Sequence, residues 1–596
     1  MTGATGKLPA RRSLGLALLA LLFALPVLPG VPVYWITLLD NAGLASLVVI
    51  GLVLLTGVGG MTSFGQAAFC GFGAFTTAVL TTRYGVSPWL TLFASCAVTL
   101  AAAALLGLLT VRLSGHYLPL GTLCWGLAIY FLFGRLEFLG RHDGVNGIPP
   151  LTFFGMPLSD SRSIFYVIWP CVALAALGTL NLLNSRTGRA IRALRGARVA
   201  AEAFGVDTAA IKLVVFLHAA LLAGLSGWLY AHMQRAVNPT PFGINPGIEY
   251  LFMAVVGGAG HVQAAVLGAG LVTLLKEALQ RALPFLAGGQ ASYEPIVFGV
   301  ALVLILQKAR EGLWPWFERL LPAAPEPPRP AEAPAPTPRA RPERGATLLT
   351  LDMARKEFQG LVAVNDVSFS VRAGEIAALI GPNGAGKSTT FNLVTGVLRA
   401  TSGAISFMGE RIETASARRI AMLGIGRTFQ HVRVQGDMSV LDNVALGAHP
   451  RGSAGVWRAV LGLDREEERR LLAEAARQIE RVGLGDVMHR PASSLSLGQL
   501  RILEIARALC LDPVLLLLDE PAAGLRHLEK EKLAALLAQL RAEGMGVLLV
   551  EHDMRFVMGL TDHVTVLDFG TKIAEGAPAE IQKNPAVIEA YLGGEA

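Results

Sequence analysis

A glycine-rich loop at Gly381–Ser388 contains the residues of this chain that are best suited to chemistry on phosphates. It reads Gly-Pro-Asn-Gly-Ala-Gly-Lys-Ser and fits the pattern G-x-x-x-x-G-K-[ST], in which backbone N–H groups surround the phosphates of a nucleotide. An apolar run, Ile376–Ile380, precedes the loop, and a helix is predicted over residues 388–397, which is the strand–loop–helix setting that the motif requires. We therefore predict a nucleotide site made of Gly381, Pro382, Asn383, Gly384, Ala385, Gly386, Lys387, Ser388 and Thr389.

Two carboxylates, a glutamine and a histidine further along the chain would complete a site for hydrolysis. Asp519 and Glu520 end an apolar run predicted to be a buried strand, where Asp519 suits Mg²⁺ coordination through water and Glu520 suits polarising an attacking water. Gln430, in Thr-Phe-Gln, suits sensing the γ-phosphate and Mg²⁺. His552 follows another apolar run and suits a hydrogen bond to the γ-phosphate. The expected ligands are ATP and Mg²⁺.

A second anion cradle is predicted at residues 495–499, which read Leu-Ser-Leu-Gly-Gln. This segment precedes a helix predicted to begin near Leu500, and a Ser-x-Gly turn before a helix N-terminus presents backbone N–H groups to an anion. Its candidate binding residues are Ser496, Gly498 and Gln499.

The composition of the 596-residue chain indicates that a membrane domain positions this chemistry. Hydrophobic residues make up 53% and charged residues only 16%, against about a quarter charged in soluble domains, and the deficit lies mostly before residue 320. The net charge of +7 is best explained by Lys and Arg that flank membrane spans, so we expect no nucleic-acid partner. The five cysteines are odd in number and include no CxxC pair, which predicts neither a disulfide nor a metal site.

Nine apolar runs before residue 320 predict about eight to ten membrane crossings. The segment Gly257–His261 interrupts one run and predicts two short elements there. Glycines inside the runs, such as Gly224 and Gly227, are expected to let helices approach closely. The runs lie near residues 14–30, 42–58, 63–81, 88–110, 117–134, 164–183, 212–231, 246–276 and 293–307.

Charged residues in this half indicate its orientation and its cargo. A cluster of Arg and Lys over residues 186–212 predicts a cytoplasmic segment. The few ionisable residues within or beside the apolar runs are expected near the membrane interfaces, which favours a neutral or zwitterionic cargo over an ion. These residues are Asp40, Glu249, Lys276 and Glu294.

Residues 322–345 are rich in Pro, Ala and charge, so they predict a linker that buries no core. Two interpretations remain open. The segment either tethers an ATPase near its permease or joins two domains that would dock in any case.

Residues 346–596 resemble the nucleotide-binding subunit of an ABC transporter, because the phosphate loop, Q-loop, signature, magnesium-binding strand and switch histidine occur in the order of that family. The resemblance implies that Lys387 contacts the β- and γ-phosphates, that Glu520 is the catalytic base and that His552 is the switch. Phe358 matches the aromatic residue that stacks on adenine, with core packing as an equal alternative. Mg²⁺ would be held by Ser388, Gln430 and Asp519.

Two residues depart from the family pattern, and one implied feature lies outside the chain. Leu497 replaces the first glycine of the signature, and Arg526 stands where many members carry Asp. Each ATP site of the family is completed by the signature of a second ATPase, so a second ATPase subunit or a homodimer is implied.

The first half resembles permeases for branched-chain amino acids. The similar stretches are Gly51–Gly57, Ser63–Phe69, Val111–Tyr117, Gly144–Gly147 and Gly257–Gly260. The segment Val199–Gly205 resembles the coupling segment Glu-Ala-Ala-x-x-x-Gly of importer permeases, with Val199 in place of Glu. The C-terminal stretches, 568–576 and 584–593, resemble an ATPase of the same system.

The expected fold is therefore a polytopic α-helical membrane permease domain (residues 1–321), a linker (322–345) and an α/β P-loop ABC ATPase domain (346–596). The resemblance implies an importer subunit in the bacterial inner membrane, multi-pass in membrane lipid, with a cytoplasmic ATPase. Its implied partners are an extracytoplasmic solute-binding protein, a second permease and a second ATPase. Import of urea or short amides, export, and a non-transporting membrane sensor remain as alternatives.

Overall fold

The computed structural model describes residues 10–286, 296–322 and 328–592, apart from 111, 112, 114, 197, 297, 298, 301, 302, 305, 306 and 310. The chain forms two compact units. The membrane unit comprises residues 1–184, 209–327 and 459–462, and the ATPase unit comprises residues 185–208, 328–458 and 463–596. Of the sequence predictions, Glu294 lies outside the described residues.

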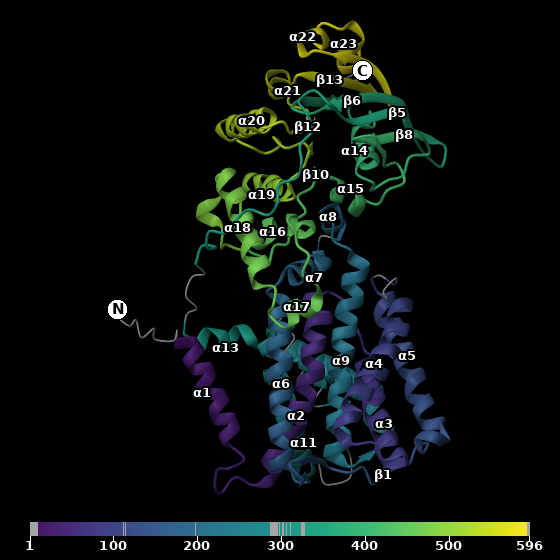
Figure 1. Ribbon diagram of the computed structural model, residues 1–596, viewed down its shortest axis with the longest axis vertical. Coiled ribbons are helices and arrows are strands. Elements are labelled where there is room, and N and C mark those ends of the chain that lie inside the picture. The colour runs from purple at the N-terminus through teal and green to yellow at the C-terminus, as the bar shows by residue number, and fades with distance from the viewer. Residues whose placement is uncertain are drawn as a thin grey trace. The chain divides into compact units, whose positions relative to one another are not determined.

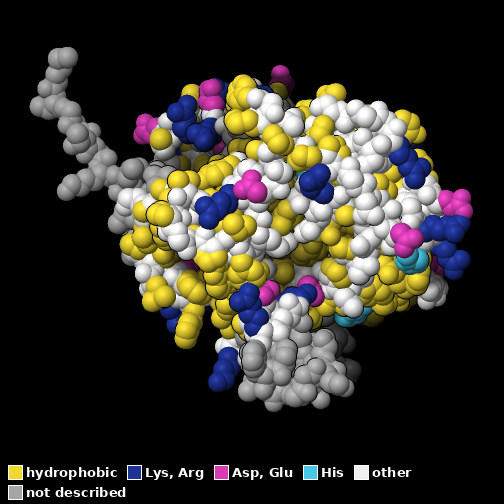
Figure 2. Space-filling model, turned by 90° about the horizontal axis from the view of Figure 1, so that it is seen from below, with side chains coloured by type: hydrophobic (Ala, Val, Ile, Leu, Met, Phe, Trp, Pro, Cys, Tyr) yellow, Lys and Arg dark blue, Asp and Glu magenta, His cyan; other side chains and the backbone are white. Residues whose placement is uncertain are grey.

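The membrane unit is a set of helices, six of which are long and apolar enough to cross a membrane within the part of the chain that the structure describes. Figure 1 shows several of them lying side by side, and Figure 2 shows hydrophobic side chains over much of the face seen from below, with only scattered charges. The helices of this unit are α1 (Ala10–Ala24), α2 (Val33–Leu52), the π-helix η1 (Val53–Val58), α3 (Gln66–Tyr84), α4 (Pro88–Thr110), α5 (Tyr117–Arg135), η2 (Glu137–Leu139), α6 (Ser161–Leu183), α9 (Thr208–Gln234), η3 (Thr240–Phe242), α10 (Ile244–Gly257), α11 (Val262–Leu286) and α13 (Trp314–Leu320).

Two short antiparallel strand pairs complete the membrane unit. They are β1 (Val145–Asn146) with β4 (Ala236–Val237), and β2 (Leu151–Phe153) with β3 (Met156–Leu158).

The predicted interruption near residue 260 is confirmed, because α10 ends at Gly257 and α11 begins at Val262. The prediction of two short elements is wrong for the second, since α11 has 25 residues and is long enough to cross a membrane. This break packs directly on η1, since a Cβ on Gly57 would lie 1.5 Å from the carbonyl oxygen of Ala259. The glycine-packing prediction is confirmed as well. A Cβ on Gly227 would lie 1.9 Å from the carbonyl oxygen of Cys70. Helix backbones therefore touch at these glycines.

Some ionisable side chains of the membrane unit form ion pairs, whereas Asp40 is buried without a hydrogen-bond partner among the described atoms. Lys276 of α11 forms an ion pair with Glu249 of α10 at 2.8 Å. Asp40 of α2 is fully buried, and neither of its carboxylate oxygens has a hydrogen-bond partner among the described atoms. No sequence pattern indicates this burial, because Asp40 precedes the predicted apolar run 42–58 instead of interrupting it.

The ATPase unit is built on a six-stranded sheet in the order β10-β11-β12-β7-β13-β14, in which only β14 is antiparallel. Its central strands are continuous apolar runs, as expected for parallel strands covered on both faces. The strands are β7 (Ile376–Ile380), β10 (Ile425–Arg427), β11 (Leu515–Asp519), β12 (Gly546–Val550), β13 (His563–Asp568) and β14 (Thr571–Gly576).

Alternate residues of these strands enter two hydrophobic cores. Leu516 and Leu549 pack with α19 and α20, whereas Leu517 and Leu548 pack with α14 and an antiparallel sheet of order β6-β5-β8-β9. That sheet consists of β5 (Thr347–Phe358), β6 (Leu361–Arg372), β8 (Ser402–Phe407) and β9 (Glu410–Arg411). The helices of the unit are α7 (Arg186–Gly196), α8 (Arg198–Ala203), α14 (Lys387–Val394), α15 (Ala417–Leu423), α16 (Val440–Gly447), η4 (His449–Arg451), α17 (Val456–Val460, whose last two residues group with the membrane unit), α18 (Arg465–Arg481), η5 (Gly485–Val487), η6 (Ala492–Ser494), α19 (Leu497–Cys510), α20 (His527–Ala542), α21 (Met554–Leu560), α22 (Pro578–Ile581) and α23 (Pro585–Leu592).

Residues 328–345, which we call the docked linker, lie against the ATPase unit instead of forming a free tether. They contain no helix and no strand, in agreement with their composition. Their backbone is nevertheless held. Asp512 accepts from the backbone N–H of Arg339 at 2.5 Å and from the Arg341 guanidinium at 3.3 Å, and Arg451 and Arg477 donate to linker carbonyls. Three of these four contacts use backbone groups of the linker, so side-chain patterns could not reveal them.

Replacing Asp512 by Ala is expected to loosen the docked linker. Each hydrogen bond to the charged carboxylate contributes about 1–3 kcal/mol, so cleavage by trypsin after Arg339 should quicken by about tenfold or more. Limited proteolysis with mass spectrometry measures this rate. Glu332→Ala, in the same segment, is the control and should leave the rate unchanged. Equal cleavage of the Asp512→Ala and unaltered proteins would show that the contacts contribute nothing.

Candidate nucleotide site and its coupling segment

The candidate nucleotide site forms at the carboxyl ends of four neighbouring parallel strands. The phosphate loop follows β7, Asp519 ends β11, His552 lies just after β12 and Gln430 lies just after β10. Because the carboxyl ends of parallel neighbours meet at one edge, the sheet order brings together motifs that are up to 171 residues apart in the sequence, from Gly381 to His552.

The phosphate loop has the backbone shape that its glycines permit. Gly384 and Gly386 have φ angles of 84° and 90°, in the left-handed region that favours glycine. A Cβ on Gly386 would lie 2.4 Å from the carbonyl oxygen of Ala363, so this position has no room for a side chain. Helix α14 begins at Lys387, and no side chain caps it, which leaves its first N–H groups for an anion.

Lys387 is folded back onto the loop. Its buried Nζ donates to the carbonyl oxygens of Gly381 and Pro382, each at 2.8 Å. Burial lowers the pKa of this amine, while the charges of Glu520 and Asp519 raise it. Two carbonyl oxygens and two carboxylates therefore attract this one cation, and phosphate oxygens would replace the two carbonyls when a nucleotide binds.

The three predicted catalytic residues, Gln430, Glu520 and His552, meet at one carboxylate oxygen, Glu520 Oε1. Gln430 Nε2 donates to Glu520 Oε1 at 2.9 Å, and His552 Nε2 lies 3.3 Å from the same oxygen. Glu520 itself has a positive φ of 50°, a conformation that costs about 1–3 kcal/mol in a non-glycine residue and recurs at functional sites. The cluster is arranged to orient a carboxylate.

Asp519 fits the donor set of a magnesium ion. It is buried, and its Oδ1 has no hydrogen-bond partner among the described atoms. Burial raises the pKa of this carboxyl group, while the charge of Arg427 lowers it. An unpaired buried carboxylate oxygen is costly unless a cation compensates it, so the residue fits a Mg²⁺ ligand.

The predicted anion cradle differs in one detail from the sequence expectation. The helix begins at Leu497, not near Leu500, because Ser496 and Gln499 form a capping box in which each side chain accepts from the backbone N–H of the other. Ser496 and Gly498 thus lie in the N-cap and first turn of α19. Leu497 is exposed, so its replacement of glycine adds an apolar side chain at this surface without disturbing the core.

Phe358 ends β5 and is 40% exposed, with the Lys356 amine 4.9 Å from its ring centre. An exposed ring argues against the core-packing alternative and leaves a face for stacking.

Glu551 was missed by the sequence analysis. It is buried, and it accepts from the backbone N–H groups of Ala522 at 2.6 Å and His552 at 3.0 Å. It therefore joins the loop after β11 to the loop after β12. Its position directly before His552 was a signal that could have identified it.

The segment predicted to couple the halves is part of the ATPase unit. Ala200, Ala203 and Phe204 are buried in the hydrophobic core that contains β11 and β12, and the Arg507 guanidinium lies 4.6 Å from the ring centre of Phe204. This burial fixes Val199–Gly205 in the ATPase unit. The five arginines over residues 186–198 are explained either by membrane topology alone or by docking contacts with the ATPase.

Two of those arginines make specific contacts. Arg189 Nη1 and Glu468 Oε2 of α18 form an ion pair at 2.7 Å, with only 3% and 10% of the side chains exposed. Arg186 donates to the carbonyl oxygens of His449, Gly452 and Ala454 at 2.6, 2.7 and 2.9 Å. By contrast, Arg198 is half-exposed, and among the described residues it pairs only with Glu202, four residues away.

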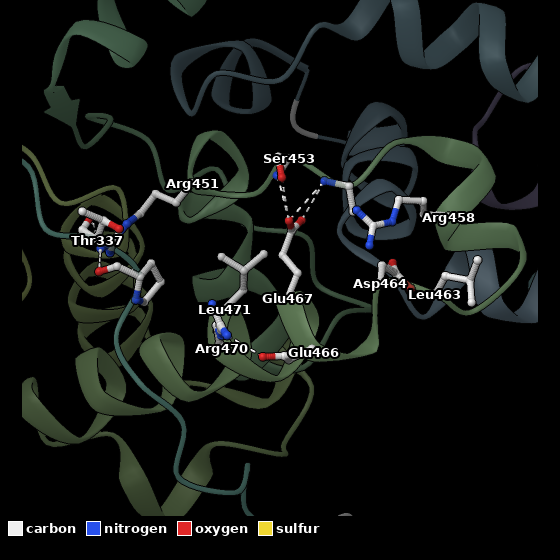
Figure 3. Close-up of a pocket in the computed structure, with 12 residues that line it drawn as sticks. Thr337, Arg451, Ser453, Arg458, Leu463, Asp464, Glu466, Glu467, Arg470 and Leu471 are labelled. Carbon is white, nitrogen blue, oxygen red and sulfur yellow. Dashed lines mark hydrogen bonds and ion pairs between the residues drawn. The ribbon is translucent and has the colours of Figure 1, made fainter.

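A cavity of about 400 Å³ opens beside these contacts, between the docked linker and α18 (Figure 3). Glu467 points toward the backbone N–H groups of Ser453 and Ala454, which donate to it at 2.9 and 3.0 Å. Glu467 therefore stabilises the loop at residues 452–454, whose carbonyl oxygens also accept from Arg186. None of the predicted nucleotide-site residues lines this cavity.

Comparisons with known proteins cover both units. The family described as "Branched-chain amino acid transport system / permease component" matches residues 34–306. "ABC transporter" matches residues 364–523, and "Branched-chain amino acid ATP-binding cassette transporter" matches residues 571–596.

Relatives of the ATPase part are similarly informative. The chain is 43% identical over 249 residues to the high-affinity branched-chain amino acid transport ATP-binding protein LivG of Salmonella typhimurium, covering 41% of this chain and 98% of LivG. It is 43% identical over 241 residues to BraF of Pseudomonas aeruginosa, covering 40% of this chain and 94% of BraF. A crystal structure of a nucleotide-free ATP-binding cassette from an ABC transporter aligns at 32% identity with a TM-score of 0.37, covering 41% of this chain and 98% of that one. The chain belongs to the branched-chain amino-acid ABC transporter family and carries its permease and ATP-binding parts in one polypeptide.

Proposed function

We propose that this chain is the fused permease and ATPase of a bacterial importer for branched-chain or other hydrophobic amino acids. The observation that carries the proposal is the union, in one chain, of the permease match with a phosphate loop that meets Asp519, Glu520 and His552 at one sheet edge. LivG and BraF, by their names, serve high-affinity branched-chain amino acid transport. The membrane would be the inner membrane, with the ATPase unit in the cytoplasm.

The residues of the site would divide the work of hydrolysis. Phe358 would stack on adenine, and the loop from Gly381 to Thr389 would bind the phosphates through its N–H groups and Lys387. Glu520 would polarise the attacking water, held in place by Gln430 and His552.

Mg²⁺, when bound, would neutralise phosphate charge, and Ser388, Gln430 and Asp519 would hold it. The unpaired buried Oδ1 of Asp519 supports this assignment.

The site would be completed by other subunits. Ser496, Gly498 and Gln499 would face the nucleotide of a second ATPase, which is either a separate subunit or a second copy of this chain. Closing two ATPases around the γ-phosphate would exclude water and strengthen the electrostatics of transfer. A solute-binding protein outside the membrane and a second permease would complete the importer.

The coupling segment would transmit this closure. Helices α7 and α8 are covalently continuous with α6 and α9 of the membrane unit, yet Phe204 and Arg189 are fixed in the ATPase unit. In exchange, residues 459–462 group with the membrane unit, where Asn181 of α6 donates to the carbonyl of Val460 at 3.1 Å. Motion within either unit would therefore pull on a segment of the other.

Glu468→Ala is expected to uncouple hydrolysis from transport. It would leave the buried guanidinium of Arg189 unpaired, a loss of about 3–5 kcal/mol. Uptake should fall at least tenfold, while ATP hydrolysis by the complex continues. Both rates are measured in the same vesicles. Arg198→Ala removes an exposed arginine of the same segment and should leave both rates near normal. Normal uptake by Glu468→Ala would contradict this coupling path.

Helix length argues against an exporter with helices that extend far beyond the membrane. The longest candidate span in the described part of the chain has 27 residues. A helix of that length is about 40 Å long, close to the full thickness of a bilayer.

The cargo is tested by uptake into vesicles that contain the complex purified from its native membrane. Labelled leucine should accumulate with internal ATP, and unlabelled isoleucine and valine should compete, whereas urea and acetamide should not. Preferential accumulation of urea or acetamide would assign the chain to amide transport instead.

A further inference from the structure

An interrupted stretch of backbone lies inside the membrane unit and carries no regular structure. The π-helix η1 ends at Val58, and α3 begins only at Gln66. Between them, the backbone N–H of Phe64 donates to Thr122 Oγ1 of α5 at 3.2 Å, and Gly65 packs against Trp125. Trp125 lies near the middle of the candidate span 117–135. Irregular backbone at such depth is tolerated only where protein buries it or where it lines a cavity.

A second helix start meets the first one at this level. Helix α10 begins at Ile244, and a Cβ on its Gly247 would lie 2.5 Å from the carbonyl oxygen of Phe64 and 3.7 Å from the Cβ of Ala67. Both helices follow a glycine, Gly65 or Gly243, and neither has a side chain that caps it. The N–H groups of the first two residues of each helix, at the positive end of that helix, therefore converge inside the bundle. The third residue of α10 is Pro246, which has no N–H, and Ala68 of α3 donates to Gly65.

A small cavity marks the point of convergence. It measures about 10 Å³, which is about the space of one water. The start of α3, the start of α10 and the middle of α5 all contribute to it, and no charged side chain lines it. The lining residues are Phe64, Gly65, Ala67, Ala68, Leu123, Gly126, Phe242, Gly243 and Ile244.

Two buried polar side chains next to this cavity lack partners in the described structure, although neither is among the residues that line it. Gln66, the first residue of α3, is 1% exposed, and neither its Oε1 nor its Nε2 has a hydrogen-bond partner among the described atoms. The residues on either side of it, Gly65 and Ala67, both line the cavity. The indole Nε1 of Trp125, whose ring packs on Gly65, is likewise buried without a partner in the described structure. Buried polar groups are nearly always bonded, so a transient ligand is the natural source of the missing bonds.

We propose that Gln66, Trp125 and the converging starts of α3 and α10 bind the cargo during passage, a zwitterionic α-amino acid with an apolar side chain. Its carboxylate accepts from the free first-turn N–H groups and from the Trp125 indole. Its ammonium group donates to Gln66 Oε1, and its side chain lies among the apolar and glycine residues of the lining. This inference rests on the proposed function.

The cavity is far too small for an amino acid in this conformation, so the structure shows the site closed. Glycine-to-backbone contacts, such as that of Gly247 with Phe64, hold the two helix starts together without large side chains between them. Separation of α10 from α3 opens the site.

Uptake of labelled leucine by vesicles containing the whole complex tests the site. Gln66→Leu keeps the volume and removes both polar groups, so the apparent KM should rise about tenfold or more, as expected for the loss of a hydrogen bond to a charged group. Gln66→Asn keeps a shorter amide and should lie between Gln66→Leu and the unaltered protein. Basal ATP hydrolysis should be unchanged in both variants, which also shows that the complex is assembled.

Thr99→Val is the matched control. Thr99 is also fully buried with an unpartnered hydroxyl in the described structure, but it contacts Gly224 on α9, away from the helix starts. It should leave the KM unchanged. An unaltered KM for Gln66→Leu in a complex that accumulates leucine would overturn the site while the importer stands. If the unaltered complex accumulates no amino acid, the proposed function fails, and this inference fails with it.

Discussion

Replacing Glu520 by Gln is expected to lower ATP hydrolysis by about 100-fold or more while ATP still binds. The change keeps the size and the contact with Gln430, but it replaces the carboxylate that would polarise water by a neutral amide. Phosphate release measures the rate, and retention of labelled ATP on the purified complex measures binding. The variant should therefore hold ATP that it cannot turn over.

The control for this prediction is Glu529→Gln, a nearby carboxylate that accepts from the backbone N–H of Arg526 at 2.8 Å and has no place in the cluster with His552. It should hydrolyse ATP at close to the normal rate. Normal turnover by Glu520→Gln would remove Glu520 as the base and would leave Glu551, which is held by two backbone N–H groups, as the carboxylate to test next.

Replacing Lys387 by Ala is expected to weaken ATP binding by about 100-fold and to abolish hydrolysis with it. The amine is buried against the loop carbonyls, so its removal takes away the one positive side chain that the loop places beside the phosphates. Charge-assisted hydrogen bonds of this kind contribute about 1.5–3 kcal/mol each. Equilibrium binding of labelled ATP measures the loss.

Lys572→Ala removes a lysine that pairs with Glu575 on β14, and it should bind ATP normally. The thermal midpoint of both variants should stay near that of the unaltered protein, because the loop backbone is set by its glycines. Unchanged affinity in Lys387→Ala would contradict the assignment of the phosphate loop.

The ATPase site could be predicted from sequence because each motif follows a strand that is a continuous apolar run. Such runs mark buried parallel strands, and the ends of parallel neighbours coincide, so Asp519 and His552 needed no knowledge of distant contacts. What failed was the start of α19, since the capping box of Ser496 and Gln499 is as compatible with a turn as with a first helical turn.

The membrane unit was predicted less completely for a different reason. Hydropathy reports helices but not breaks that conserve apolar character, so residues 63–65 were assigned to the same run as α3 and the start of α2 at Val33 was missed. The interruption after Gly257 was visible only because four small or polar residues follow one another there. The number of membrane crossings remains a prediction.

The contacts of the docked linker and of the coupling segment could not be predicted from the sequence. Residues 328–345 bind in large part through backbone carbonyls and N–H groups, which every sequence has. For the arginines at 186 and 189, topology and docking predict the same residue type. The ion pair of Arg189 with the buried carboxylate of Glu468 identifies docking as the role of Arg189. The sequence could not indicate this pair, because Glu468 lies 279 residues away from Arg189.

The central claim is that ATP hydrolysis in one unit of this chain drives a solute through the other. The most direct measurement is leucine accumulation and phosphate release in the same sealed vesicles, with ATP inside, for the unaltered complex and for Glu520→Gln. We predict that accumulation rises with phosphate release in the former and that both stop together in the latter. Accumulation that persists in Glu520→Gln, or hydrolysis by the unaltered complex that moves no solute, would contradict the claim.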